Sequence, residues 1–287
     1  MWAIAIAVDK LVLVRWRVTP ALMCFLAALV ELAAAGGVWM VLGLSEMPYP
    51  VIALALCAGI FKTLFYLFYY LAVTREEVSR IATLDSLTPL VILLSAGFVL
   101  NESLQPQEHL GVILVVSGAV LITCKGRLYP RLNLAFCFAL LGVLCTTVNQ
   151  IITKHLLETT DYWTVFATVR VGVFFAVLPL LPKVVSSLKV LRSERKWSVL
   201  ALIAANNTIA VSGLFIFTIA VSLGSVTLVN AVGSVHSIFL LLIVVVVGIV
   251  NPGLLREELK KSVLVQKLIA ILLMVSGTVV ISGVSLS

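Results

Sequence analysis

The stretch FYYLAVTREEVSRIATLDSLTPLVILLSAGFVLNESLQPQEHLGVILVVSGAVLIT, residues 68–123, decides the fold. It holds two long apolar runs, 81–100 and 110–123, separated by a short polar turn. Four residues that are polar or break helices interrupt the first run: Asp85, Ser86, Thr88 and Pro89. A soluble domain would not surround so few polar residues with so much continuous apolar surface. The pattern predicts two membrane helices, the first of which carries polar groups inward.

The composition of the whole chain agrees with a membrane protein. Hydrophobic residues make up 62% of the 287 residues and charged residues 11%, whereas soluble domains are about 45–50% apolar and about 25% charged. The net charge of +7 comes from basic residues scattered over short loops, without a nucleic-acid-binding motif. Basic loops of this kind face anionic lipid. The expected partner is therefore the lipid bilayer, and no nucleic acid is expected.

Ten apolar runs divide the chain into two halves. The runs are 1–14, 20–42, 50–73, 81–100, 107–123, 133–156, 162–181, 198–221, 227–249 and 263–285. Most are about 20 residues long, the length of a membrane-crossing helix, but the first is too short unless its basic neighbours reach back to the interface. We predict a first five-helix repeat at 1–124, a linker at 125–132 and a second five-helix repeat at 133–287.

Short strings near the end of the first half resemble a known family. They are Ala72-Val73, Leu87-Thr88-Pro89-Leu90, Leu100-Asn101-Glu102 and Leu110-Gly111-Val112 followed by Gly118. In this order they resemble the end of the first repeat in EamA-like members of the drug/metabolite transporter superfamily. The resemblance extends more weakly over nearly the whole chain. It implies an all-α, polytopic membrane protein with ten transmembrane helices, arranged as two inverted five-helix repeats around a central cavity.

The two halves also match each other directly. Residues 8–11 match 148–151, Glu31 matches Arg170, Ala72-Val73 matches Ala220-Val221, Thr88 matches His236 and Gly118 matches Gly277. Five helices per half is an odd number, so the two copies must enter the membrane in opposite senses. Inverted repeats that hold a substrate site between them are a transporter architecture.

The distribution of basic residues predicts an orientation. If the ten spans hold, sixteen of the twenty lysines and arginines lie on one side, and only Lys154 lies on the other. The positive-inside rule makes the basic side cytoplasmic. Both termini would then face outward, which departs from the arrangement usual for the resembled family.

Charged residues within the runs are the strongest candidates for a site, because each costs about 2.5–3.5 kcal/mol at the membrane centre and needs a partner or water. They are Asp9, Lys10, Glu31, Lys62, Asp85 and Arg170. Asp9 and Lys10 fit pairing or helix ends best. Glu31 and Arg170 lie about mid-run at matching positions, which favours a role in a substrate path.

Neutral polar residues extend this candidate site. Lys62, Tyr66 and Tyr69 share one helical face, which suits either a pocket wall or packing. Asparagines within the runs fit helix–helix hydrogen bonds as well as substrate binding, and the same two roles stay open for His236. We expect a central substrate-binding cavity lined by Glu31, Lys62, Tyr66, Asp85, Asn149, Arg170, Asn207 and Asn230.

Three local features carry further expectations. Pro89 should kink its helix and leave a carbonyl free near Thr88. Residues 183–197 have apolar positions at helical spacing among basic ones, which suits a short helix on the membrane surface. Four glycines should mark close packing of helices: Gly36, Gly37, Gly111 and Gly118.

The sequence predicts a gradient-driven transporter of a small polar or amphipathic metabolite that works by alternating access in the cell membrane. It contains no HExxH, GxSxG or P-loop signature, so no enzyme, cofactor or metal is expected. The five cysteines form no CxxC pair and fit free thiols. The alternative is a non-transporting receptor or assembly subunit on the same scaffold. A homodimer is left open.

Overall fold

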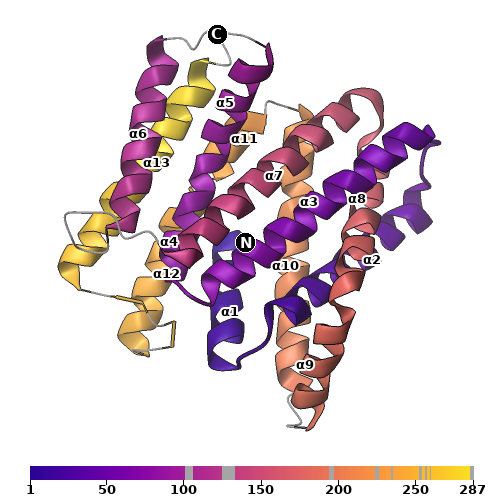
Figure 1. The fold of residues 1–287 in the computed structure, drawn as a ribbon, viewed down its shortest axis with the longest axis horizontal. Coiled ribbons are helices and arrows are strands. Elements are labelled where there is room, and N and C mark those ends of the chain that lie inside the picture. The colour runs from indigo at the N-terminus through magenta and orange to yellow at the C-terminus, as the bar shows by residue number, and fades with distance from the viewer. Residues whose placement is uncertain are drawn as a thin grey trace.

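A computed structural model describes residues 1–100, 106–124, 133–193, 197–223, 226–233, 235–251, 254–255, 257–258 and 260–284. Within these ranges the only regular secondary structure is helical (Figure 1). The predicted all-α class is therefore confirmed. The predicted linker and the turn at 101–103 lie outside the described residues.

The helices of the first half follow the predicted runs. They are α1 (Trp2–Arg15), α2 (Pro20–Leu42), α3 (Tyr49–Val73), α4 (Val78–Leu84), the 3₁₀ turn η1 (Asp85–Leu87), α5 (Thr88–Leu100) and α6 (Pro106–Thr123). At the start of α2, the Thr19 hydroxyl accepts a hydrogen bond from the Leu22 N–H and Pro20 occupies the first turn. Both features favour a helix start at this position.

The helices of the second half also follow the predicted runs. They are α7 (Leu134–Thr159), α8 (Tyr162–Val177), the 3₁₀ turn η2 (Leu178–Leu180), α9 (Leu181–Ser193), α10 (Trp197–Leu223), α11 (Val226–Gly233), α12 (His236–Val250) and α13 (Lys261–Val284). The described chain forms ten helical segments, as predicted, if three groups are each counted as one interrupted helix. These groups are α4–η1–α5, α8–η2–α9 and α11–α12.

Length and composition make this an integral membrane protein. Seven described helical stretches are long and apolar enough to cross a membrane, and two shorter apolar helices accompany them, Leu110–Ile122 and His236–Val250. With 14 residues, α1 is about 21 Å long, less than the roughly 30 Å of a bilayer core.

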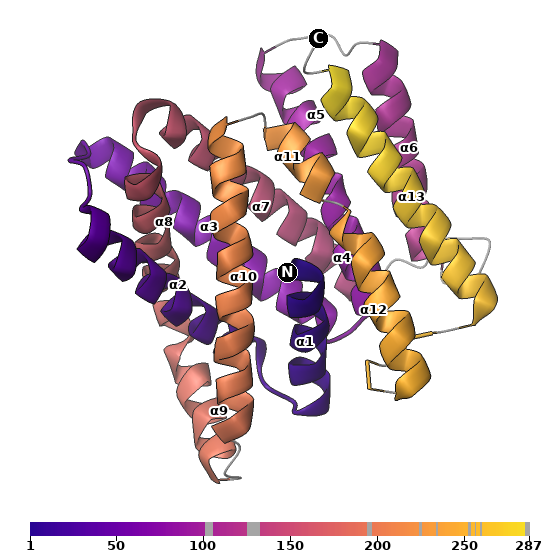
Figure 2. The same cartoon turned by 180° about the vertical axis from the view of Figure 1, so that it is seen from behind.

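Helices of the two halves pack against each other throughout the molecule. α3 packs on α7 and α8, α2 packs on α8, and α1 packs on α10 and α12. Figures 1 and 2 show these helices around the centre, with α6 and α13 side by side at one edge. The centre of the bundle is therefore built by residues from both halves.

Two of the interrupted helices break at matching positions. Pro89 has no N–H to bond the Asp85 carbonyl, and the Thr88 N–H bonds that carbonyl instead, which forms η1. The carbonyl is thus satisfied, and the expectation of a free carbonyl is wrong. The second break separates α11 from α12 just before His236, the residue that matches Thr88 in the repeat.

The predicted surface helix at 183–197 is present in part as α9. It follows α8 through η2 and continues downward in Figure 1, beside α2 and the lower part of α10. A contact of 2.6 Å between the hydroxyls of Thr19 and Ser187 ties it to the start of α2. It extends a membrane helix and does not lie across the helix ends, which corrects the prediction.

The glycine predictions are half right. A Cβ at Gly118 would lie 2.7 Å from the Ala270 carbonyl, and a Cβ at Gly111 would lie 2.9 Å from the Gly277 carbonyl. These two glycines therefore permit the close contact of α6 with α13. A Cβ at Gly36 or Gly37 would meet nothing within 4 Å, so the close-packing prediction is wrong at both.

The tightest approach involves glycines that the sequence did not single out, Gly59 in α3 and Gly172 in α8. A Cβ at Gly59 would lie 2.5 Å from backbone atoms of Gly172 and Val173. Gly59→Ala should therefore push α3 from α8 and destabilise the protein by about 1–3 kcal/mol, as overpacking does. Thermal unfolding in detergent measures this. Gly36→Ala is the matched control and should not destabilise; an equally stable Gly59→Ala variant would contradict the prediction.

Candidate functional site

A central cavity of about 190 Å³ lies between the two halves. Residues of α1, α2, α3, η1, α5, α7, α8, α10, α11 and α12 line it. All eight residues that the sequence predicted as a site contribute to this lining: Glu31, Lys62, Tyr66, Asp85, Asn149, Arg170, Asn207 and Asn230. The cavity thus brings together residues that lie up to about 200 positions apart in the chain.

The buried pair Glu31 and Arg170 joins the two halves at this cavity. The Arg170 Nε lies 3.5 Å from the Glu31 Oε2, and both side chains are almost fully buried. The Tyr66 hydroxyl donates to Glu31 Oε1, and the Arg170 guanidinium lies 4.7 Å from the centre of the Phe166 ring. Neither Arg170 Nε nor Glu31 Oε2 has a hydrogen-bond partner among the described residues. The two charged groups therefore lie close together, but each has one atom that makes no hydrogen bond within the described residues.

Lys62 and Asp85 are placed differently, because neither has a direct ionic partner. The Lys62 Nζ lies 4.7 Å from the centre of the Phe65 ring and 4.8 Å from that of the Tyr66 ring. Among the described residues no carboxylate lies within 4.0 Å of this ammonium, and the Asp85 carboxylate has no hydrogen bond. Both side chains are half-buried and line the cavity.

The three predicted asparagines divide into two kinds. The Asn149 amide donates to the Ala58 carbonyl at 2.9 Å, and the Asn230 amide exchanges two hydrogen bonds with Gln150 at 2.6 and 3.2 Å. Both therefore help to hold helices together while they line the cavity. The Asn207 amide nitrogen is buried and has no partner within the described residues, so Asn207 can still donate a hydrogen bond.

Comparison with known proteins agrees with the resemblance. Residues 1–124 match the sequence model of the EamA-like transporter family. Residues 1–124 are therefore similar to members of this family. One solved structure, described only as the crystal structure of a protein, has 17% sequence identity with this chain and a TM-score of 0.60. The match covers 98% of this chain and 96% of the other chain. At that identity the likeness shows the fold alone. A search among curated proteins gave no match.

Several residues that line the cavity were not predicted as site residues. Asp9, which fitted a structural role best, lines the cavity, and accepts a hydrogen bond from the Asn206 amide at 2.9 Å and one from Tyr69 at 3.3 Å. Trp2 packs on Phe217 at 5.4 Å between ring centres. His236 lies 6.3 Å from Trp2, and its Nε2 has no partner in the described chain. In the sequence, His236 could have been recognised because it matches Thr88, the residue before Pro89.

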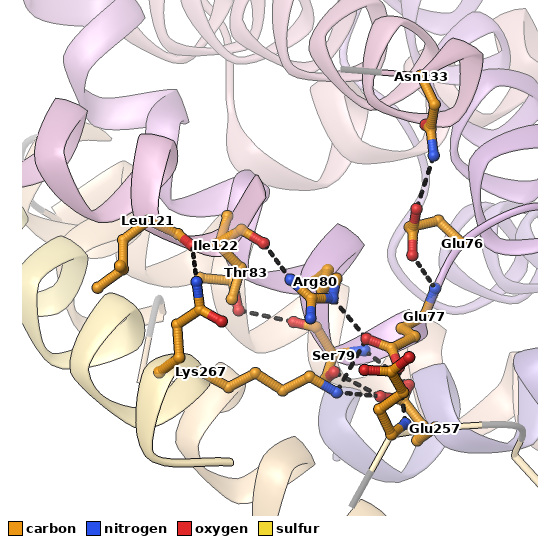
Figure 3. A network of polar contacts seen from close by, with 12 residues as sticks. Glu76, Glu77, Ser79, Arg80, Thr83, Leu121, Ile122, Asn133, Glu257 and Lys267 are labelled. Atoms are coloured by element: carbon orange, nitrogen blue, oxygen red, sulfur yellow. Dashed lines mark hydrogen bonds and ion pairs between the residues drawn. The ribbon is translucent and has the colours of Figure 1, made fainter. Parts of the chain in front are cut away.

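A second polar cluster, which the sequence did not predict, joins the halves at one end of the helices (Figure 3). We call it the end cluster: Glu77, Arg80, Glu257 and Lys267. The Lys267 ammonium lies 3.0 Å from Glu77 and 2.8 Å from Glu257. Arg80 also pairs with Glu77 and donates to the Ile122 carbonyl. Arg80 and Lys267 were counted only among the basic residues on one side of the membrane, and the structure shows both fully buried.

The end cluster should make stability sensitive to acid. Burial alone would raise the pKa of Glu77, but Lys267, Arg80 and the Glu258 N–H together lower it below the ordinary value of 4.5. The folded protein thus prefers the carboxylate more than the unfolded chain does, so this stabilisation is present above pH 4.5 and is lost as the pH falls below it. The unfolding temperature in detergent should drop below pH 4.5, and Glu77→Gln should reduce that dependence. An unchanged dependence in the variant would contradict this origin.

Proposed function

We propose that the protein is a gradient-driven transporter of a small polar or amphipathic metabolite, and that it works by alternating access to the central cavity. The observation that carries this proposal is the cavity itself, in which an acid from one half meets a base from the other among membrane helices. A charge within a membrane costs free energy and normally marks a pathway for polar solutes or ions. The EamA-like match of residues 1–124 supports the same class.

We also propose that the halves are inverted repeats, and reciprocal contacts support this. The sequence offsets match Asp9 with Asn149 and Ala58 with Asn206. Asn206 donates to Asp9, and Asn149 donates to Ala58. The two contacts therefore join the same pair of positions with the halves exchanged, although the donor lies at the other position in each. Reciprocal contacts of this kind are expected from a two-fold axis.

Contacts at the edge of the bundle indicate the direction of that axis. Gly118 approaches Ala270, and Gly111 approaches Gly277. The offset that matches Gly118 with Gly277 also matches Gly111 with Ala270. Exchanging the two halves therefore turns the contact of Gly118 with Ala270 into the contact of Gly111 with Gly277. The order of the residues makes α6 and α13 antiparallel. Matching helices that are antiparallel require an axis across the helices, in the membrane plane, as in inverted-repeat transporters.

Lysines near the matching ends of α1 and α7 give a further pair. The Lys10 ammonium donates to the Val73 carbonyl at 2.7 Å, and the Lys154 ammonium donates to the Val221 carbonyl at 3.2 Å. Val73 and Val221 match in the repeat. Each lysine thus binds the C-terminal end of the third helix in its own half, where a positive charge is favourable.

Reconstituted vesicles test the proposed transport. The purified protein in proteoliposomes should exchange at least one member of a metabolite panel faster than empty vesicles do, with or without a pH gradient. The panel should cover cationic, anionic, zwitterionic and neutral solutes. Absence of exchange for every solute, with protein shown to be folded and inserted, would favour the alternative of a non-transporting receptor or assembly subunit.

We place the protein in the cell membrane with its basic end, which includes the loop before α10, in the cytoplasm. Ser198 lies in the first turn of α10 and is exposed. In a variant without the five native cysteines, Ser198→Cys should not react with an impermeant thiol reagent added outside intact cells, but should react after the cells are opened. Ready labelling from outside would reverse the orientation.

A further inference from the structure

Two short helices occupy matching positions in the two halves but lie in different environments. The offset that matches Thr88 with His236 also matches α4 with α11. All seven residues of α4 are buried, and none of them lines the cavity. In α11, none of the residues whose exposure the structure describes is buried: 229, 230, 232 and 233. Val232 is 65% exposed. One of the two matching helices is therefore enclosed and the other is open.

The enclosed helix α4 lies between the cavity and the basic end of the bundle. α1 and α3 finish at that end, and α4 begins shortly after α3. Asp85 and Thr88, which directly follow α4, line the cavity. About 10 Å of buried helix thus separates Asp85 from the basic end. At the opposite end the cavity reaches Trp2, near the start of α1, and Val221, near the end of α10. The cavity therefore extends away from the basic end.

The end cluster fastens the beginning of α4 to the second half (Figure 3). The Ser79 N–H and hydroxyl donate to the Glu257 carboxylate at 3.1 and 2.6 Å. The Glu77 carboxylate accepts from the Glu258 N–H at 2.7 Å and lies 3.0 Å from the Lys267 ammonium. Hydrogen bonds to ionised groups are the stronger ones in proteins. α4 cannot move away from the second half unless these contacts break.

The opposite end of the molecule lacks the residues for a matching cluster. The repeat offsets place Ser225, Leu228 and Glu108 at the positions of Glu77, Arg80 and Lys267, in that order. Two of these charges are thus replaced by neutral residues and the third by a charge of opposite sign. The same contacts cannot hold α11 in an enclosed position. The two ends therefore differ in how firmly they can be closed.

We propose that α4 is a gate between the cavity and the basic end, and that the end cluster is the lock that keeps this gate shut. The conformation described here is the one closed at the basic end. Access from that end requires release of the end cluster and movement of α4. Since the matching residues cannot form the same lock around α11, the closed basic end is the resting state. This inference rests on the proposed alternating access and adds the helix and the residues that control one side.

Thiol labelling of the purified, full-length protein in detergent tests the gate without transport. Two reporters are introduced separately into a variant without the five native cysteines, and the rate of reaction with fluorescein maleimide is measured. Ala82→Cys reports on α4, and Ala55→Cys reports on the packing of α3 far from the end cluster; both alanines are fully buried. With the lock intact both reporters should react slowly. Ser86→Cys, a buried replacement of similar size beside α4, substitutes for Ala82→Cys if that variant does not fold.

Glu257→Gln should release the gate and leave the rest of the fold closed. It removes the negative charge that the Ser79 hydroxyl and the Lys267 ammonium contact. Labelling at position 82 should become at least about tenfold faster, as expected for the loss of one hydrogen bond to a charged group. Labelling at position 55 should not change. Ser79→Ala removes the hydroxyl contact alone and should act in the same direction with a smaller effect.

Two results would overturn the gate. Equal acceleration at positions 82 and 55 would mean that the end cluster only stabilises the whole fold. An unchanged rate at position 82, in both Glu257→Gln and Ser79→Ala, would mean that the end cluster does not hold α4. Glu158→Gln changes an exposed acid outside the end cluster and is the matched control; it should leave both rates unchanged.

A reversible link across the lock connects the gate to transport. In Ser79→Cys with Glu257→Cys, a short bis-methanethiosulfonate reagent should join α4 to the second half. Exchange of any solute that the wild-type protein moves in proteoliposomes should stop in the linked protein and return after reduction. Exchange that continues in the linked protein would overturn the gate and leave transport intact. The expected labelling pattern, with no exchange of any solute by the wild-type protein, would leave the gate intact and overturn transport.

Discussion

Replacing Glu31 with Gln should reduce transport per folded molecule to the level of empty vesicles, and Arg170→Gln should do the same. Each substitution leaves one buried charge without its partner at 3.5 Å, in the middle of the proposed pathway. Breaking a buried pair in this way costs about 3–5 kcal/mol, so some loss of folded protein is expected as well. The rate must therefore be divided by the amount of folded, inserted protein.

The double variant Glu31→Gln with Arg170→Gln distinguishes a transport role from a structural one. It removes both charges, so no unpaired charge is left and stability should recover toward that of the wild-type protein. Transport should nevertheless remain absent, because the charges themselves are needed. A double variant that transports at the wild-type rate per molecule would make the pair purely structural. Glu158→Gln changes an exposed acid and should transport normally.

Lys267→Met should strongly reduce the stability of the protein. The Lys267 ammonium is fully buried and lies between Glu77 and Glu257. Without it two carboxylates face each other, and among the described residues Arg80 is the counter-charge that is left. We expect a loss of about 3–5 kcal/mol, measured as a lower unfolding temperature in detergent. Methionine keeps most of the apolar length of the lysine, so lost packing contributes little.

A second substitution provides the control for the end cluster. Adding Glu257→Gln to Lys267→Met removes one of the facing carboxylates and should restore part of the lost stability. Lys189→Met changes an exposed lysine in α9 and should have little effect. If Lys267→Met were as stable as the Lys189 variant, the ion pairs of the end cluster would not contribute to the folded state.

The helices and most of the cavity lining were predictable because both depend on local patterns. Apolar runs of membrane length indicated the ten segments. Polar residues within such runs face inward wherever they are, so Glu31, Lys62, Asp85 and Arg170 could be assigned to a cavity without knowledge of which helices touch. The match of Glu31 with Arg170 further placed them at a common depth.

Features that depend on contacts between distant segments were not predictable. Glu77 and Lys267 are 190 positions apart, and nothing in either local pattern indicates that they pair. Loop acids and loop bases look exposed in a sequence, and only packing of α13 on α4 buries them. Gly59 and Gly172 meet for the same reason. Asp9 appeared structural because it lies in a short helix, whereas the position of α1 against α10 brings it to the cavity.

The contact between Glu31 and Arg170 has a consequence for the way the two halves fit together. In the proposed inverted repeat the two residues occupy matching positions and yet bear opposite charges. Two copies of residues 1–124 assembled in the same manner would bring two Glu31 carboxylates together, and two copies of the second half would oppose two arginines. The opposite charges therefore make the halves complementary to each other, and each neutralises the buried charge of the other.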